Sequence, residues 1–299
     1  MEAVIRLEGL TKFYGRNRGV EGLDLEVYAG EAFGYLGPNG AGKTTTIRLL
    51  LDLIRPTSGR AVVLGSEPRR GGAALRRRVG YLAGDPALYR KMTGRQLLTY
   101  LGHLRGLDGL GPAESLAQRL ELDLSRPIGD LSRGNRQKVA VVQAFMHSPQ
   151  LLVLDEPTSG LDPLMQREFY RLVAEAKAEG RTVFLSSHVL SEVERIADRV
   201  GIVREGRLVV VEGLDALKAK ALRRLEIHFA APVARDEFAA LPGVQDVVVE
   251  GSVLTCTAVG SIDGLVKAAA RHEVTNLVTH EADLEELFLR YYEGAGDAA

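Results

Sequence analysis

The residues with the most recognisable chemistry lie between positions 35 and 50, in the stretch YLGPNGAGKTTTIRLL. From Gly37 to Thr44 they follow the spacing G-x-x-x-x-G-K-[ST], which is typical of a phosphate-binding loop. Glycines let the backbone turn until several amide groups point at one anion, a following helix adds its positive end, and Lys43 adds a full charge. The Thr44 hydroxyl is suited to a magnesium ion. The predicted loop residues are Gly37, Pro38, Asn39, Gly40, Ala41, Gly42, Lys43, Thr44 and Thr45.

A chance match is the alternative for this loop, because the chain contains 33 glycines. The flanking segments argue against chance. EAFGYLG, before the loop, reads as a strand, and TTTIRLLLDLI, after it, reads as a helix. This strand–loop–helix context is what the motif requires.

A second group of polar residues follows short apolar runs. LLVLDEP places Asp155 and Glu156 where a buried parallel strand ends, and ligands bind at that edge of a parallel sheet. Asp155 is suited to magnesium, directly or through water, and Glu156 is suited to orienting or deprotonating a water. His188 ends the next such strand, RTVFLSSH, and we expect it to contact a γ-phosphate. The alternative for Asp155 and Glu156 is a strand that merely ends with two acids. The alternative for His188 is a purely structural role.

The elements that position these residues are predicted from hydropathy patterns. Strands and helices alternate around Asp155 and His188, which indicates an α/β fold with a mostly parallel sheet. The stretches AVIRLEGLTKFYG and VEGLDLEVYAGEAFGYLG alternate apolar and polar residues and read as antiparallel strands at the front. The middle, about residues 86–147, has helical spacing and reads as a helical subdomain. We therefore predict a P-loop NTPase fold over residues 1–221.

Residues 222–299 are predicted to form a small α+β domain. RRLEIHFA and VQDVVVEGSVLTCTAV read as strands, and GSIDGLVKAAARH and DLEELFLRYYEG read as helices. A separate cluster of arginines between positions 69 and 78 reads as a solvated helix face rather than a basic binding patch.

Composition excludes several classes of protein. The formal net charge of −1 gives no electrostatic case for nucleic acid. A lone cysteine, Cys256, rules out a disulfide framework, suits a reducing cytoplasm and reads as core filler. The N-terminus lacks a signal pattern, and no window approaches 18 consecutive apolar residues. If the protein serves a membrane process, we expect another chain to cross the bilayer.

Taken together, these motifs resemble those of an ATP-binding-cassette (ABC) ATPase, the nucleotide-binding subunit of a transporter. The loop at 37–44 resembles the Walker A motif and LLVLDE the Walker B motif. SGLD at 159–162 resembles the D-loop, His188 the switch histidine, and LSRGN at 131–135 the signature sequence LSGGQ. The resemblance covers roughly residues 3 to 220. The tail resembles the accessory domain of many ATPases paired with ABC-2-type export permeases.

The resemblance implies roles for further residues. Tyr14 matches the aromatic residue that stacks on adenine, although a tyrosine packed in the core is the alternative. Ser132 and Gly134 match signature residues that face the γ-phosphate of ATP held by a second copy, and Asp162 belongs to the D-loop. The family pattern therefore implies ATP and Mg²⁺ as ligands and a dimer, expected to be a homodimer, that sandwiches two ATP molecules.

The chain departs from the family pattern at three positions. Arg133 and Asn135 stand where the signature has Gly and Gln, and we expect both to be tolerated. Gly84 stands where the Q-loop glutamine is expected. We predict that the adjacent Asp85 partly substitutes as an oxygen ligand toward the metal. The alternative is that Asp85, preceding Pro86, only caps the following helix.

The expected function is ATP hydrolysis that drives export through separate transmembrane permease subunits, with the chain peripheral on the cytoplasmic face of the membrane. A DNA-repair or chromosome ATPase would need a long coiled coil between Lys43 and Asp155, and no sustained heptads occur there. A translation factor usually carries two cassettes. A non-transport ABC ATPase with a regulatory or immunity role stays open, and the transported substrate is not readable from the sequence.

Overall fold

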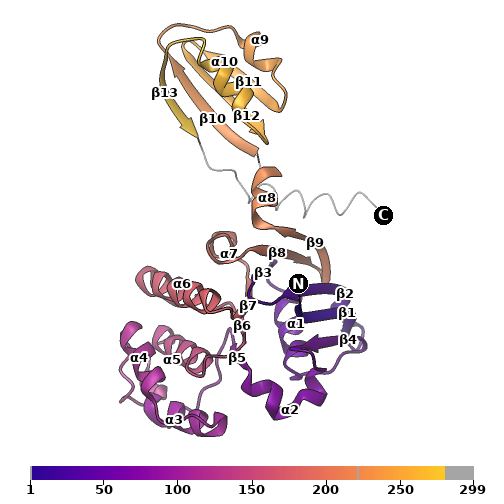
Figure 1. Cartoon of the computed structure of the whole chain (residues 1–299), viewed down its shortest axis with the longest axis vertical. Helices are drawn as coiled ribbons and strands as arrows, with labels where there is room; N and C mark the ends of the chain where they lie inside the picture. Colours follow the sequence, from indigo (N-terminus) through magenta and orange to yellow (C-terminus); the bar gives the residue numbers. More distant parts are fainter. Residues whose placement is uncertain (1, 221, 280–299) are drawn as a thin grey trace. The chain divides into compact units, whose positions relative to one another are not determined.

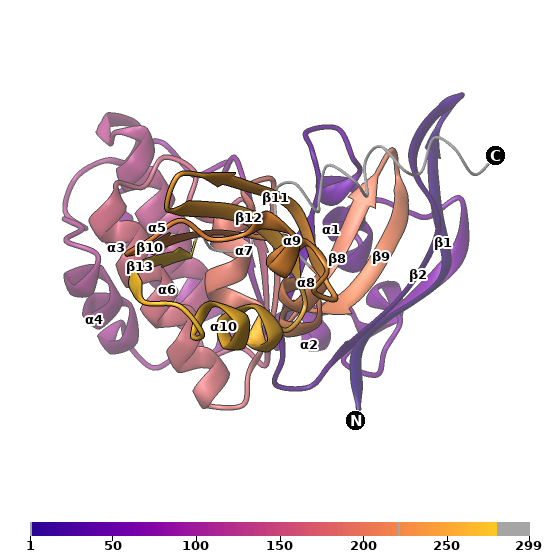
Figure 2. The same cartoon turned by 90° about the horizontal axis from the view of Figure 1, so that it is seen from above.

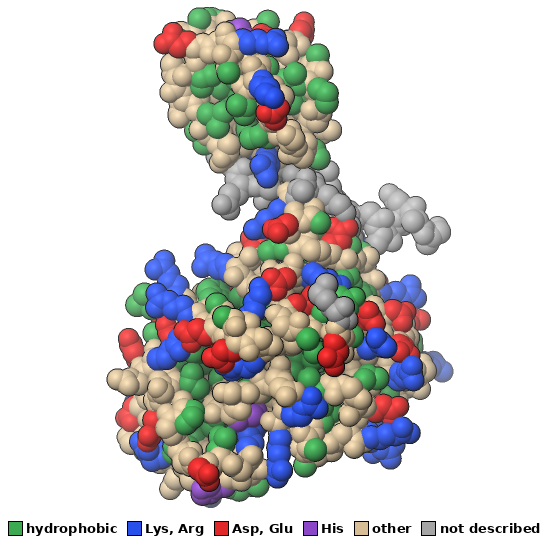
Figure 3. All heavy atoms as spheres, in the orientation of Figure 1, with side chains coloured by type: hydrophobic (Ala, Val, Ile, Leu, Met, Phe, Trp, Pro, Cys, Tyr) green, Lys and Arg blue, Asp and Glu red, His purple; other side chains and the backbone are tan. Residues whose placement is uncertain are grey.

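The computed structural model describes residues 2–220 and 222–279 and divides the chain into two compact units (Figure 1). The first unit is Met1–Val211 and the second is Glu212–Ala299, so the division falls before the boundary expected after residue 221. Among the described residues, no helix combines the length and the apolar character that crossing a bilayer requires. On the face drawn in Figure 3, basic and acidic side chains are interspersed over the first unit.

A six-stranded sheet forms the centre of the first unit, in the order β5-β6-β7-β3-β8-β9. The pairs β3–β7, β3–β8, β5–β6 and β6–β7 are parallel, which confirms the predicted α/β class. The expectation for residues 32–36 was wrong, because they join this parallel sheet rather than the antiparallel strands before them. The strands are β3 (Ala32–Leu36), β5 (Val79–Leu82), β6 (Leu151–Asp155), β7 (Thr182–Ser187), β8 (Arg199–Arg204) and β9 (Arg207–Gly213).

An antiparallel sheet, ordered β2-β1-β4, forms the front of the first unit, and its long strands are seen in Figure 2. Its register pairs Leu7 with Leu25 and Ile5 with Val63. Alternation along the strands buries these side chains in one core with Phe33 and Ile47 from the central sheet and its first helix. The strands are β1 (Ala3–Tyr14), β2 (Asn17–Tyr28) and β4 (Ser58–Val63).

Helices connect and cover the strands of the first unit. Helices α3, α4 and α5 lie between β5 and β6 in the chain and form the predicted helical segment. The arginine-rich α2 is exposed along its basic side chains, as the sequence predicted. The helices are α1 (Lys43–Leu50), α2 (Pro68–Arg77), α3 (Gly94–Arg105), α4 (Gly111–Arg119), the short 3-10 helix η1 (Ile128–Asp130), α5 (Arg133–Phe145), α6 (Pro163–Ala178) and α7 (Leu190–Ile196).

The start of α3 corrects one expectation about Asp85. Residues 86–93 hold no helix, and α3 begins at Gly94. Thr93 caps it, accepting a hydrogen bond from the Gln96 amide while the Gln96 side chain accepts one from the Thr93 amide. Asp85 therefore does not cap the following helix.

The second unit is a four-stranded antiparallel sheet, ordered β11-β12-β10-β13, with α9 and α10 packed on it. Its own core includes Phe229, Phe238, Leu254 and Leu265. The predicted strands and the helix at residues 263–269 are present, whereas the predicted helix DLEELFLRYYEG lies outside the described residues. The elements are α8 (Leu214–Lys220), β10 (Leu222–Phe229), α9 (Arg235–Ala239), β11 (Val244–Glu250), β12 (Val253–Val259), α10 (Asp263–Ala269) and β13 (Val274–Thr279).

Candidate active site

The loop between β3 and α1 has a backbone that only glycine permits at two points. At Gly37, a Cβ atom would lie 2.3 Å from the carbonyl oxygen of Val203. At Gly42, φ is +105°, and a Cβ atom would lie 2.7 Å from the carbonyl oxygen of Gly19. These close approaches explain why the motif needs glycine at both positions. The loop then leads directly into the first turn of α1.

Lys43 begins α1 and turns its side chain back over the loop. Its side chain is only 6% exposed, and Nζ donates hydrogen bonds to the carbonyl oxygens of Gly37, at 2.7 Å, and Pro38, at 3.2 Å. Nζ also lies 3.2 Å from Oε1 of Glu156. A buried cation is thus held beside the loop amides, where a phosphate group would bind.

Thr44 and Asp155 meet across the sheet edge. The Thr44 hydroxyl donates to Oδ2 of Asp155 at 2.9 Å, and the Ser186 hydroxyl donates to Oδ1. Asp155 is 3% exposed and ends β6, next to β7. A hydroxyl and a carboxylate are hard oxygen ligands of the kind Mg²⁺ prefers. The described residues contain no group of three or more acidic, histidine or cysteine side chains placed for a metal.

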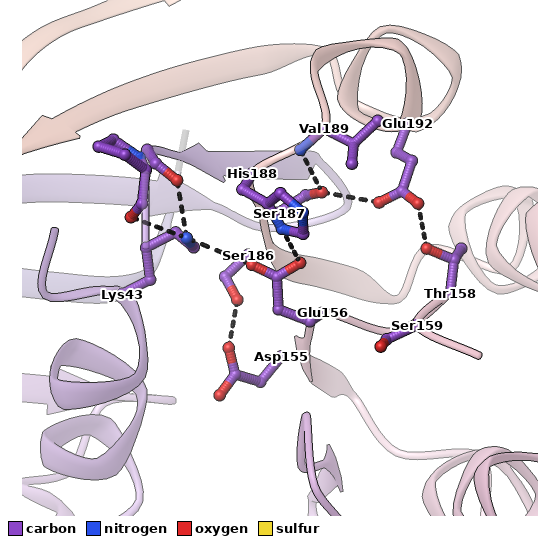
Figure 4. A network of polar contacts seen from close by, with 12 residues as sticks. Lys43, Asp155, Glu156, Thr158, Ser159, Ser186, Ser187, His188, Val189 and Glu192 are labelled. Carbon is purple, nitrogen blue, oxygen red and sulfur yellow. Dashed lines mark hydrogen bonds and ion pairs between the residues drawn. The ribbon is translucent and has the colours of Figure 1, made fainter. Parts of the chain in front are cut away.

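Glu156 directs its carboxylate away from that of Asp155 (Figure 4). Its φ of +46° turns the chain sharply at the end of β6. Oε1 faces Lys43, while Oε2 accepts a hydrogen bond from Nδ1 of His188 at 2.7 Å. His188 follows β7, as predicted, and its side chain is 50% exposed. The structure therefore brings Lys43, Glu156 and His188 into one contact group.

Glu192 forms a second contact group beside the first, which the sequence patterns did not reveal (Figure 4). Its carboxylate accepts hydrogen bonds from the hydroxyl groups of Thr158 and Ser187. The Ser187 hydroxyl in turn accepts a hydrogen bond from the Val189 amide at 3.0 Å. The only sequence signal was an acidic residue in the first turn of the helix after His188, which is too common to single out.

A pocket of about 300 Å³ opens above the loop. Tyr14 lies at it with 45% of its surface exposed, so the alternative of a core tyrosine is wrong. Nζ of Lys12 lies 5.2 Å from the centre of the Tyr14 ring. Arg18 and Gly19 are lining residues that sequence analysis did not identify. The pocket is lined by Tyr14, Arg18, Gly19, Asn39, Gly40, Gly42, Lys43, Thr44, Thr45 and Glu156.

The LSRGN segment leads into α5 and packs on the loop that follows Glu156. Ser132 caps the helix by accepting a hydrogen bond from the Asn135 amide at 3.2 Å. The Arg133 guanidinium donates to the Ser159 hydroxyl at 3.0 Å, and a Cβ atom on Gly134 would lie 2.7 Å from the carbonyl oxygen of Gly160. Within the described chain, neither Ser132 nor Gly134 lines the pocket above the loop.

The structure also places Asp162 and Asp85, two further residues that the sequence predicted for the site. The Asp162 carboxylate caps α6 by accepting hydrogen bonds from the amides of Leu164 and Met165 at 3.0 Å, and the bond from Met165 is the main cause that lowers its pKa. Asp85 is exposed. A Cβ atom on the preceding Gly84 would lie 3.3 Å from the carbonyl oxygen of Asp155, so this segment runs beside the acidic edge of the sheet.

A phosphate-binding loop, two acids and a histidine at one sheet edge, and a capped LSRGN helix define an ATP-binding-cassette ATPase. Comparison with known proteins supports this assignment. The family profile described as ABC transporter matches residues 20–159. The bacitracin transport ATP-binding protein BcrA of Bacillus licheniformis is 37% identical over 77% of this chain and 76% of its own length. The chain belongs to the ABC transporter ATP-binding proteins, and it is an ATPase.

Two further comparisons extend this result. A fluoroquinolones export ATP-binding protein of Mycobacterium tuberculosis is 33% identical over 96% of this chain and 92% of its own length. A solved structure of an ATP-binding subunit of an ABC transporter is 31% identical, with a TM-score of 0.67, over 72% of this chain and 92% of that one. The first of these similarities extends over both units.

Proposed function

We propose that this chain is the ATP-hydrolysing subunit of an exporter and works through separate membrane-spanning permease subunits, of the ABC-2 type, on the cytoplasmic face of the membrane. The observation that carries this proposal is the similarity to the fluoroquinolones export protein, which covers 96% of the chain and so includes most of the second unit. A similarity limited to the ATPase unit would support ATP hydrolysis without supporting export.

We infer the following division of roles from the site. Lys43 and the loop amides bind the β- and γ-phosphates of ATP, and the Tyr14 ring stacks on adenine. Thr44 and Asp155, whose oxygens lie 2.9 Å apart, would hold Mg²⁺, and such an ion would neutralise charge on the phosphate oxygens. Glu156 orients or deprotonates the attacking water, and His188, hydrogen-bonded to Glu156, contacts the γ-phosphate. No covalent enzyme intermediate is needed.

We propose that two copies of the chain form the working ATPase. Ser132 and Gly134 lie outside the pocket that their own chain offers, although they begin a helix whose amides suit an anion. In this arrangement they face the γ-phosphate held by the second copy, and Asp162 shapes the adjoining loop by capping α6. Asp85, which follows Gly84, would supply an oxygen ligand toward the metal in place of the glutamine that the family pattern expects at Gly84.

Export is tested by expressing the chain with a permease encoded beside it. We expect the chain to be recovered with the permease in membranes, and cells carrying both to accumulate less of an exported compound, with bacitracin and a fluoroquinolone as the first probes. Glu156→Gln is the matched control, because it should keep assembly but lose export. If cells that carry the chain without any permease are protected from the compound equally well, a regulatory or immunity role replaces export.

A further inference from the structure

We propose that Glu192 is a positioning residue for ATP hydrolysis: it ties the loop after β6 to the loop after β7 and so holds Glu156 and His188 in contact. This inference rests on the roles proposed above for Glu156 and His188. Glu192 does not contact the reacting atoms itself. It acts through the backbone of the two segments that carry those side chains.

The two carboxylate oxygens of Glu192 serve different loops (Figure 4). Oε1 accepts a hydrogen bond from the hydroxyl of Thr158, two residues after Glu156. Oε2 accepts one from the hydroxyl of Ser187 at 2.7 Å, directly before His188. Hydrogen bonds to an ionised carboxylate are stronger than neutral ones, so one side chain bridges both segments firmly.

The bridge reaches the backbone on both sides of His188. The Ser187 hydroxyl donates to Glu192 and accepts from the amide of Val189 at 3.0 Å. The orientation of that hydroxyl, and with it the turn around His188, therefore depends on Glu192. Half of the His188 side chain is exposed, so packing alone does not fix the ring, and its position depends on the backbone turn and on the hydrogen bond to Glu156.

Glu192 itself lies on a well-anchored element. Its neighbours in α7, Leu190, Val193 and Ile196, are buried. They pack the helix against β3, β7 and α6. The carboxylate is thus presented from a fixed position, whereas the loops that it joins are short connections. Removing a group that orients a metal ligand typically lowers affinity or activity by about 10- to 100-fold, and we expect a similar loss for a group that orients catalytic side chains.

The test compares Glu192→Ala and Glu192→Gln with Ser191→Ala, an exposed residue of the same helical turn, as the matched control. We expect Glu192→Ala to lower kcat by about 10- to 100-fold while the Kd for ATP changes less than about threefold, because the pocket above the loop does not include Glu192. Glu192→Gln should recover most of the rate, since both hydroxyls can reorient toward an amide. An unchanged kcat in Glu192→Ala overturns the proposal.

A double-mutant cycle separates positioning from general loss of structure. Thr158→Val and Ser187→Ala each remove one arm of the bridge, and their effects on kcat should be smaller when Glu192 is already alanine. Full additivity, or a fall in thermal stability and ATP affinity in parallel with kcat, contradicts a positioning role. Glu156→Gln is measured alongside. If Glu156→Gln keeps the parent rate, the proposed role of Glu156 fails; if only the Glu192 variants keep it, the inference about Glu192 fails.

Discussion

At the scale of single residues, the charged groups of the site pair with one another. The Lys43 ammonium is surrounded by two carbonyl oxygens and the Glu156 carboxylate, and Glu156 also binds His188. In the proposed binding mode, a γ-phosphate at Lys43 would compete with Glu156 for the same cation. We infer that bound ATP would free one oxygen of Glu156 for a water molecule and so connect ATP binding to hydrolysis.

Glu156→Gln should leave ATP binding largely intact and slow hydrolysis by about 100-fold or more, because the amide cannot take a proton from water. Steady-state phosphate release and binding of a fluorescent ATP analogue measure the two quantities separately. Glu179→Gln, which alters an exposed glutamate after α6, is the control and should match the parent. Parent-rate hydrolysis by Glu156→Gln would show that another residue handles the water.

His147 should make the folded chain less stable in mild acid. Burial, followed by the charge of Arg105, lowers its pKa from 6.5 to about 4, and Nε2 donates to the carbonyl oxygen of Val79. As pH falls from 6.5 toward 4, the unfolded chain gains a proton that the folded chain does not, so stability falls, by about 1–2 kcal/mol after allowance for partial exposure. Denaturant unfolding at pH 7.5 and pH 5 measures this slope. His147→Gln should reduce the loss of stability between pH 7.5 and pH 5. An equal loss in the variant and the parent would show that His147 is not its source.

Asp85→Ala should raise the magnesium concentration needed for half-maximal turnover, by about tenfold if the carboxylate contributes through a water. Gly84→Gln in that background should restore part of the loss. Nucleotide binding without magnesium should not change, which gives an internal control. Because α3 is capped by Thr93, a loss of helix capping does not explain a shift in the magnesium requirement. An unmoved requirement would remove Asp85 from the site.

At the scale of elements, one arginine fastens the helical segment to the helix after the D-loop. Arg119, in the last turn of α4, donates to Glu168 and to both oxygens of Glu175, all at 2.7 to 2.8 Å. Glu168 and Glu175 lie two turns apart on one face of α6. Their hydrogen bonds raise the pKa of Arg119, and the bond with Glu175 makes the larger contribution. The segment that carries Ser132 is thereby held to the helix that Asp162 caps.

Arg119→Ala should lower the free energy of unfolding by about 1 kcal/mol, because the pair with Glu175 is partly exposed. It should also lower ATP turnover more than ATP binding, since the loop pocket does not include α4. Arg171→Ala is the matched control, because the ion pair of Arg171 with Glu168 lies within α6 and does not join two elements. Equal effects of the two variants would show that Arg119 does not couple the elements.

The parts that sequence patterns predicted are those encoded in one continuous segment. The loop before Lys43 and the apolar run ending at Asp155 are local, so their elements and the α/β class followed directly. The partners of Glu192 and Arg119 come from distant segments, and a single sequence does not show which side chains the fold brings together. Residues 32–36 were assigned to the wrong sheet because alternation does not reveal strand direction. The alternative role of Asp85 as a helix cap is wrong, because the next helix starts only at Gly94.

At the scale of the whole molecule, the chain comprises two units with separate cores. The first unit contains the loop, both acids, the histidine and the LSRGN helix. In the proposed dimer, each active site needs Ser132 from the other copy. That arrangement makes activity a property of two chains, whereas ATP binding stays a property of one.

Ser132→Arg should block hydrolysis while leaving ATP binding to the monomer within about threefold, because Ser132 lies outside its own pocket. The control is Ser132→Ala, which loses the same helix cap, worth about 1 kcal/mol, without adding bulk. Mixing Ser132→Arg with Lys43→Ala subunits should restore activity through dimers that retain one intact site. Hydrolysis that is independent of protein concentration, and unharmed by Ser132→Arg, would refute the shared site.

The position of Cys256 gives the second unit a chemical reporter of its own. It is the single cysteine in the sequence, lies buried on β12 opposite Leu225, and burial raises its thiol pKa to about 11. A thiol reagent attacks only the exposed thiolate, so alkylation must wait until that core opens. Labelling kinetics followed by mass spectrometry would therefore give the opening free energy of the second unit alone. A change in the labelling rate when ATP is added would give, as a free energy, the coupling between ATP binding to the first unit and opening of the second.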